Sequence, residues 1–136
     1  MKKIFLLAGL LLAAFVSFAQ QDYKVVFDLT SRDTIDHKNV IRWIRGISAE
    51  YPGAQLEIVL YGKSLDMITK DKSIVPDAVM SLAAKDNITI AVCAVAMKNN
   101  NVEKSQLLPG VTIVPDGIYE IIKKQQQGWG YIKVSK

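Results

Sequence analysis

The segment Ile88-Thr-Ile-Ala-Val-Cys-Ala-Val-Ala-Met97 joins two kinds of structure at a single cysteine. Its first part, Ile88 to Val92, is a short apolar run rich in β-branched residues, which is typical of a strand buried on both faces. The residues after Cys93 favour a helix, which ends at the polar run Asn99-Asn100-Asn101. The segment therefore predicts a buried strand that delivers Cys93 to the start of a helix.

The same alternation of strand and helix extends over the rest of the chain. Apolar runs predict four more strands, at residues 23–29, 56–61, 111–114 and 131–134. Amphipathic segments predict helices at about 35–51, 76–85 and 118–127, with a helical turn at 65–69. Since parallel strands need helical crossovers, this order predicts a three-layer α/β/α fold with a parallel sheet of about five strands. In the last helix, Ile118, Ile121 and Ile122 form an apolar stripe that we expect to face the core.

The N-terminus has the composition of a secretory signal peptide. Met1-Lys2-Lys3 precedes an unbroken apolar run over residues 4–16, and small residues stand at Ser17 and Ala19. The apolar run is shorter than the roughly 20 residues with which a helix crosses a bilayer, so a retained membrane anchor is the less favoured alternative. We therefore predict a cleaved signal peptide over residues 1–19, and a periplasmic or otherwise exported protein without stable membrane insertion.

Residues 20–136 form one predicted domain with nearly balanced charge. The full chain has 17 Lys and Arg residues against 13 Asp and Glu, and two of the lysines lie in the leader. The charges are interleaved, as at Lys70-Asp71-Lys72, without the basic stripe of a nucleic-acid-binding protein. No glycine-rich phosphate loop follows a predicted strand. We expect neither a nucleic-acid partner nor a cofactor.

Cys93 is the only cysteine and the strongest candidate for chemistry. Ligands of an open parallel sheet bind beyond the carboxyl ends of its strands, which is where Cys93 is expected. The backbone N–H groups at a helix start favour a thiolate, so Ala94 and Val95 are candidates to stabilise it. Two further candidates follow the neighbouring predicted strand: Gly62 and Lys63 could bind a ligand or stabilise the thiolate. There are two alternatives: Cys93 is a small core residue, or it forms an interchain disulfide.

Other familiar sites find less support. His37, the only histidine, lies among charged residues at the start of the first predicted helix, where we expect it to be solvated. One histidine and one cysteine are too few ligands for the usual zinc site, so we expect no metal. Asp28, Asp66 and Asp116 stand near the ends of predicted strands or helices, where carboxylates are commonly helix caps or solvated groups.

The segment 88–97 resembles the DsrE/DsrF-like family of sulfur-relay proteins, which includes the sulfur-carrier subunits of tRNA thiolation. The segments 107–111, 114–117 and 127–133 (LLPGV, VPDG and QGWGYIK) look like the exported branch of that family. The resemblance implies a three-layer α/β/α domain, homo-oligomeric assembly, and a Cys93 that holds sulfane sulfur as a persulfide. Asn99-Asn100-Asn101 departs from the family, since many relatives have a basic residue and a glycine there.

Two hypotheses of function follow. In the first, Cys93 attacks a sulfane donor, holds the sulfur as a persulfide and passes it to an acceptor thiol. In the second, the protein is a non-catalytic oligomeric module that binds a small ligand at the same edge of the sheet, with Cys93 as packing. The sequence identifies neither the sulfur donor nor the acceptor, and it leaves open whether the protein is an enzyme.

Overall fold

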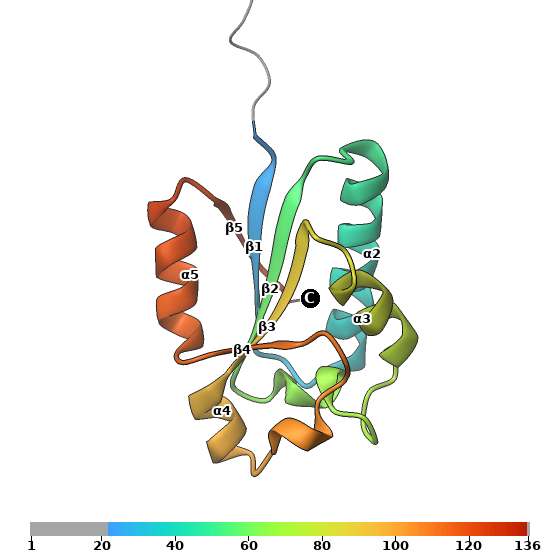
Figure 1. The fold of residues 1–136 in the computed structure, drawn as a ribbon, viewed down its shortest axis with the longest axis vertical. Coiled ribbons are helices and arrows are strands. Elements are labelled where there is room, and N and C mark those ends of the chain that lie inside the picture. Colours follow the sequence, from blue (N-terminus) through green and yellow to red (C-terminus); the bar gives the residue numbers. More distant parts are fainter. Residues whose placement is uncertain (1–21, 136) are drawn as a thin grey trace, which may run out of the picture.

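The computed structural model describes residues 22–135, which form a five-stranded sheet (Figure 1). The strands lie in the order β4-β3-β2-β1-β5, and every neighbouring pair is parallel. Their bounds are β1 Lys24–Leu29, β2 Gln55–Leu60, β3 Ile88–Cys93, β4 Thr112–Val114 and β5 Gly130–Lys133. The predicted parallel sheet is confirmed. The predicted signal peptide lies outside the described residues.

Helices cover both faces of the sheet. Figure 1 shows α2 and α3 on one face, α5 on the other, and α4 beyond the carboxyl end of β3. Their bounds are α2 Thr34–Glu50, α3 Pro76–Ala83, α4 Ala94–Asn99 and α5 Gly117–Gln126, with 3₁₀ turns η2 Ser64–Ile68 and η3 Lys104–Gln106. The predicted α/β/α layering is confirmed. None of the helices within residues 22–135 is long and apolar enough to span a membrane.

The main core lies between the sheet and the pair α2 and α3. Alternate strand residues such as Phe27, Ile58 and Ile90 point into it and are fully buried. The opposite face holds a much smaller apolar cluster, made of Val26, Val59, Ala91 and Ile121. The sheet is therefore anchored on one side by a large apolar core, while the other side leaves room for polar groups.

An ion pair helps to hold α5 on the sheet. The Nζ atom of Lys124 lies 2.8 Å from Oε2 of Glu57, a buried carboxylate on β2. Burial raises the pKa of Glu57, and the Lys124 ammonium opposes that rise. The side of α5 that faces the sheet consists of Gly117, Glu120, Ile121 and Lys124.

Only one residue of the apolar stripe predicted for α5 is buried. Ile121 joins the small cluster, whereas Ile118 is 57% exposed and Ile122 is 42% exposed. The prediction that all three face the core is therefore wrong. Its physical reason lies in the sheet, because Glu57 on β2 attracts Lys124 and so turns another side of the helix inward.

His37 is buried rather than solvated, with 2% of its surface exposed. Its Nε2 atom lies 2.9 Å from the carbonyl oxygen of Ser31. The loop between β1 and α2 folds back over the first turn of α2, so the ring keeps a hydrogen bond while it is buried. The prediction of a solvated histidine is wrong.

Candidate functional site

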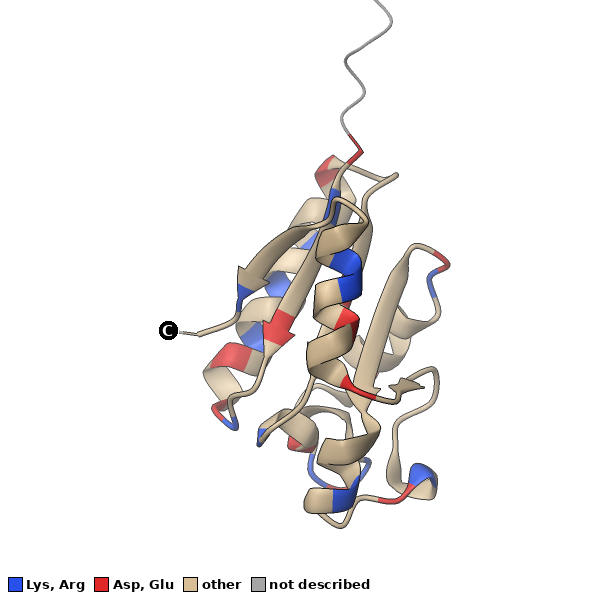
Figure 2. Cartoon of the chain, turned by 90° about the vertical axis from the view of Figure 1, so that its left-hand side faces the viewer, with Lys and Arg blue, Asp and Glu red and all other residues tan. Residues whose placement is uncertain are grey.

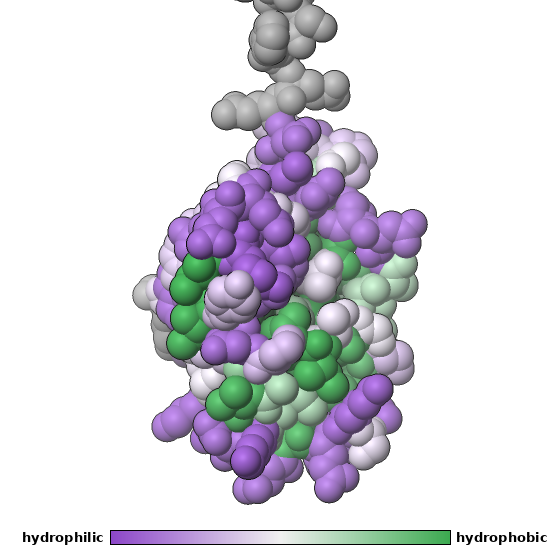
Figure 3. Space-filling model, turned by 60° about the vertical axis from the view of Figure 1, so that its left-hand side comes forward, coloured by the Kyte–Doolittle hydropathy of each residue, from purple (hydrophilic) through white to green (hydrophobic). Residues whose placement is uncertain are grey.

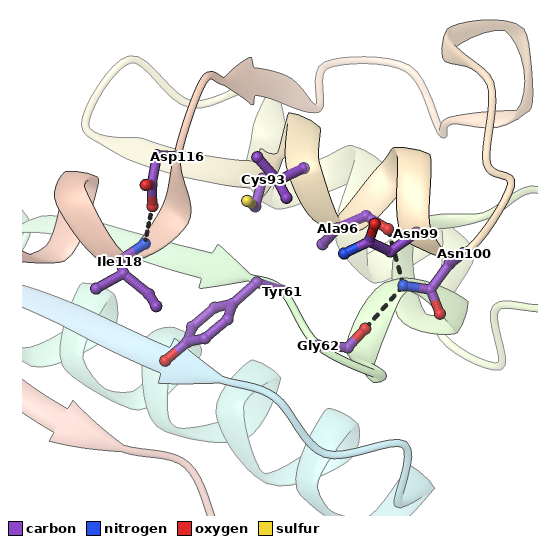
Figure 4. Close-up of a pocket in the computed structure, with 9 residues that line it drawn as sticks. Tyr61, Gly62, Cys93, Ala96, Asn99, Asn100, Asp116 and Ile118 are labelled. Carbon is purple, nitrogen blue, oxygen red and sulfur yellow. Dashed lines mark hydrogen bonds between the residues drawn. The ribbon is translucent and has the colours of Figure 1, made fainter.

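Cys93 ends β3 and is the residue that precedes the first turn of α4. Its backbone is extended, with φ −70° and ψ 122°. The side chain is only 6% exposed, yet it lines a cavity of about 230 Å³ at the carboxyl edge of the sheet (Figure 4). The thiol is thus sheltered from bulk solvent and faces an open space.

The cavity lies where three segments meet: the turn after β2, helix α4 and the start of α5. Figure 4 shows Cys93 between the starts of α4 and α5. The lining residues are Tyr61, Gly62, Cys93, Val95, Ala96, Asn99, Asn100, Asp116 and Ile118. Asp116 is the one charged side chain among these lining residues, so the cavity contains no cation of its own.

Gly117 allows the first turn of α5 to approach Cys93 closely. A Cβ atom on Gly117 would lie 3.0 Å from the Cβ of Cys93 and 3.2 Å from Cγ1 of Val59. Both distances are shorter than carbon atoms prefer. Asp116 starts the helix, because its Oδ1 accepts a hydrogen bond from the backbone N–H of Ile118 at 2.9 Å. The expectation that Asp116 is a helix cap is confirmed.

Asn100 fixes the end of α4 against the turn after β2. Its Nδ2 atom donates to the carbonyl oxygens of Gly62, at 2.9 Å, and of Ala96, at 2.8 Å. Gly62 has a φ of +62°, a conformation that glycine adopts without strain. These hydrogen bonds hold two walls of the cavity together.

The structure brings most of the predicted site residues to one place. Cys93, Gly62 and Val95 line the cavity, and Ala94 follows Cys93 as the first residue of α4. The first backbone N–H groups of a helix have no partner within the helix and favour a negative charge nearby. Lys63 is not among the residues that line this cavity; it lines a neighbouring one.

A polar cluster that the sequence did not reveal lies beside Tyr61. Asp28 is 5% exposed, and its carboxylate accepts hydrogen bonds from the Tyr131 hydroxyl at 2.6 Å and the Lys133 ammonium at 3.2 Å. It is therefore neither a cap nor a solvated group. Asp28 and Lys133 are register partners in β1 and β5, so strand alternation could have placed them on one face had the pairing been known.

Asp28 also acts on the two tyrosines of this cluster. Burial, together with the Asp28 carboxylate, raises the pKa of Tyr61 to about 12. The hydrogen bond to Asp28, together with burial, raises the pKa of Tyr131 to about 12. Both phenols therefore remain protonated well above neutral pH, and the Tyr61 ring is a neutral wall of the Cys93 cavity.

The chemistry that this site offers is that of one thiol. Cys93 is a free cysteine and the one strong nucleophile among the lining residues. Over residues 22–135, no group of three or more His, Cys, Asp and Glu side chains is placed to hold a metal ion. A thiol so placed can attack a sulfur atom, or it can pack against a bound ligand.

Fold and site together define an α/β/α protein with a single cysteine at the carboxyl end of a central strand. A model of the DsrE/DsrF-like family matches residues 9–134. The chain therefore belongs to the DsrE/DsrF-like family, as its sequence predicts. No curated protein matches the chain.

Solved structures of three proteins are similar to this chain. The protein of unknown function MTH1491 from Methanobacterium thermoautotrophicum has a TM-score of 0.77 and 26% identity, over 82% of this chain and 99% of that one. The protein of unknown function BT1422 from Bacteroides thetaiotaomicron has a TM-score of 0.68 and 18% identity, over 82% and 95%. The ychN protein from E. coli has a TM-score of 0.69 and 12% identity, over 83% and 99%. The last two likenesses concern the fold alone.

Proposed function

We propose that the protein is a sulfur carrier that holds sulfane sulfur as a persulfide on Cys93. Membership of the DsrE/DsrF-like family implies a role of the sulfur-relay type. The observation that supports this particular role most is the position of Cys93, which lines a cavity between the starts of α4 and α5. A cysteine that served only as packing would need no such opening.

The proposed transfer needs only thiol chemistry. The Cys93 thiolate attacks the outer sulfur of a donor persulfide R–S–SH; an Sγ–S bond forms, the donor S–S bond breaks, and R–S⁻ leaves. Cys93 then carries –S–SH. An acceptor thiolate attacks the terminal sulfur, and Cys93 leaves as the thiolate. The backbone N–H groups of Ala94 and Val95 favour negative charge at Sγ in both steps.

The low exposure of Cys93 supports a second candidate function. With 6% of its surface exposed, Cys93 also fits a non-catalytic module in which the same cavity binds a small ligand and the thiol only fills space. Under that function, ligand binding depends on the cavity and not on the reactivity of the sulfur atom.

Substituting Cys93→Ser separates these two functions. The protein is incubated with polysulfide, excess donor is removed by gel filtration, and the sulfide that a small thiol then releases is measured. A carrier releases about one sulfide per wild-type chain and only background from Cys93→Ser. Equal release from both proteins contradicts the carrier. If the protein is instead a binding module, neither the wild type nor Cys93→Ser releases sulfide above background.

The proposed setting of this function is outside the cytoplasm. Residues 1–19 have the basic start, apolar middle and small residues of a signal peptide, which supports a periplasmic or otherwise exported domain from residue 20 onward. N-terminal sequencing of protein from a native periplasmic or secreted fraction tests this, with Gln20 expected first. A chain that keeps Met1 and stays in the cytoplasm contradicts it.

The proposed assembly is a homo-oligomer that uses the side of α5. Ile118 and Ile122 leave large apolar surfaces exposed there, and Figure 3, which brings this side forward, shows apolar residues gathered between polar regions. Light scattering tests the assembly. Ile118→Glu with Ile122→Glu is expected to shift the protein to monomer, whereas Ile74→Glu, an exposed position outside α5, leaves its mass unchanged. A monomeric wild-type protein contradicts the proposal.

A further inference from the structure

A second cavity, of about 270 Å³, lies beside the Cys93 cavity and has a basic lining. Its residues are Arg32, Lys63, Leu65, Asp66, Lys72, Asn100 and Val102. The three cations come from three different segments: the loops after β1, after β2 and after η2. Figure 2 shows basic and acidic residues mixed over the chain, so three cations around one carboxylate are a local excess of positive charge.

The single carboxylate in this cavity neutralises the cations only in part. Asp66 lies 3.8 Å from Nε of Arg32 and 3.5 Å from Nζ of Lys72, and both contacts are long. Within residues 22–135 the ammonium of Lys63 makes no ion pair or hydrogen bond, although its backbone N–H donates to Thr30. The cavity therefore offers an unpaired cation to an anionic group.

Asn100 lines both cavities, so the two lie next to each other at the carboxyl edge of the sheet. Its hydrogen bonds to Gly62 and Ala96 keep that shared wall in place. The two cavities differ in chemistry on either side of it: one contains the thiol and no cation, and the other contains three cations and no nucleophile. One small molecule with a sulfur atom at one end and an anionic group at the other matches both.

We infer that the basic cavity is a subsite of the Cys93 site, and that it binds the carboxylate of a small acidic thiol whose sulfur lies beside Cys93. The inference rests on the proposed function, because it names the class of molecule that brings the sulfur as a persulfide or takes it as a thiol. Asp116 in the Cys93 cavity repels an anionic end, whereas Lys63 and Lys72 attract it. Lys63 thus acts on the ligand rather than on the thiolate.

The test compares two donors: glutathione persulfide and its dimethyl ester, in which both carboxylates have lost their negative charge. The variant Lys63→Gln with Lys72→Gln removes two cations of the cavity and keeps polar side chains. Arg45→Gln with Lys85→Gln removes two exposed cations elsewhere and is the matched control. The rate at which Cys93 gains sulfur is followed by intact-mass spectrometry.

We expect the cavity variant to load from the acidic donor about fivefold more slowly than wild type, the effect of losing two solvent-exposed ion pairs. From the methylated donor it loads at the wild-type rate, and the control variant matches wild type with both donors. If wild type loads equally fast from both donors, or the cavity variant slows with both, the subsite is wrong while the sulfur carrier stands.

A binding measurement decides the subsite without any sulfur transfer. S-methylglutathione, which has no reactive thiol, is titrated into the wild-type protein and the variants and followed by NMR. We expect the cavity variant to bind it about fivefold more weakly than wild type and than the control variant. Absence of binding to wild type, or equal binding by all, overturns the inference. If neither donor adds sulfur to Cys93, the proposed function is wrong. The titration with S-methylglutathione then tests the subsite by itself.

Discussion

The first turn of α5 packs directly on Cys93 because Gly117 has no side chain: a Cβ atom there would lie 3.0 Å from the Cβ of Cys93. Within residues 22–135, α5 is the helix that covers this face of the sheet, and it starts at Gly117. The close approach of α5 to Cys93 therefore depends on a glycine at the start of another helix.

Gly117→Ala is expected to destabilise the protein by about 1–3 kcal/mol, the usual result of forcing an extra carbon into a packed site. Urea unfolding measures the change. Gly46→Ala is the control, since Gly46 lies within α2 with nothing within 4 Å of its missing Cβ, and alanine there is expected to stabilise by about 0.5–1 kcal/mol. A Gly117→Ala protein as stable as wild type contradicts the contact.

Asn100→Ala is expected to cost about 1–2 kcal/mol of folding free energy, because the carbonyl oxygens of Gly62 and Ala96 each lose a donor. The neighbouring Asn99→Ala changes a residue that lines the same cavity, and its effect is expected to stay within about 0.5 kcal/mol. Thermal and urea unfolding of the two variants compare them. Equal effects would show that the hydrogen bonds of Asn100 do not hold the cavity walls.

Two of the five tyrosines are expected to titrate late. The pKa values of Tyr61 and Tyr131 are raised to about 12 from an ordinary value of 10.0, and Asp28 contributes to both shifts. The protonated phenols therefore stabilise the fold below pH 10, and this contribution is lost as the pH rises towards 12. The ultraviolet absorbance of tyrosinate follows the titration.

In Asp28→Asn the same two tyrosines are expected to titrate closer to pH 10, because the negative charge that opposes their ionisation is gone. A wild-type protein in which all five tyrosines titrate together near pH 10 would rule out the Asp28 cluster.

Lys124→Met is expected to destabilise the protein by about 3 kcal/mol at neutral pH, because Glu57 then keeps a buried charge without its partner. The loss shrinks at acidic pH: burial raises the pKa of Glu57, and once protonated the carboxyl needs no cation. Lys85→Met, which removes an exposed lysine that makes no ion pair within residues 22–135, is expected to change stability little. The two variants unfolding alike would contradict a buried ion pair under α5.

The positions of strands and helices could be predicted because short apolar runs and helical periodicity are local signals. The orientation of α5 could not. The spacing of Ile118, Ile121 and Ile122 describes an apolar side of the helix, but the position of Glu57 on the opposing sheet decides which side turns inward. The prediction for His37 was wrong for a similar reason, since the partner of its ring is a backbone carbonyl in a folded-back loop.

The candidate site was predictable as far as it follows from topology. The carboxyl ends of parallel strands share one edge, so Gly62, Cys93 and Val95 could be placed together from the sequence. The contact of Asp28 with Lys133 joins strands from opposite ends of the domain, and only the strand order reveals it. Lys63 directly follows Gly62 but lines the neighbouring cavity, which the sequence does not indicate.

The most direct test of the account is peptide mass spectrometry of the native protein after exposure to polysulfide, with iodoacetamide used to trap persulfides. We expect one additional sulfur atom on the peptide that contains Cys93, and we expect a reducing thiol to remove it. A Cys93 that iodoacetamide alkylates in the native protein, but that never gains sulfur from polysulfide, would contradict a sulfur carrier.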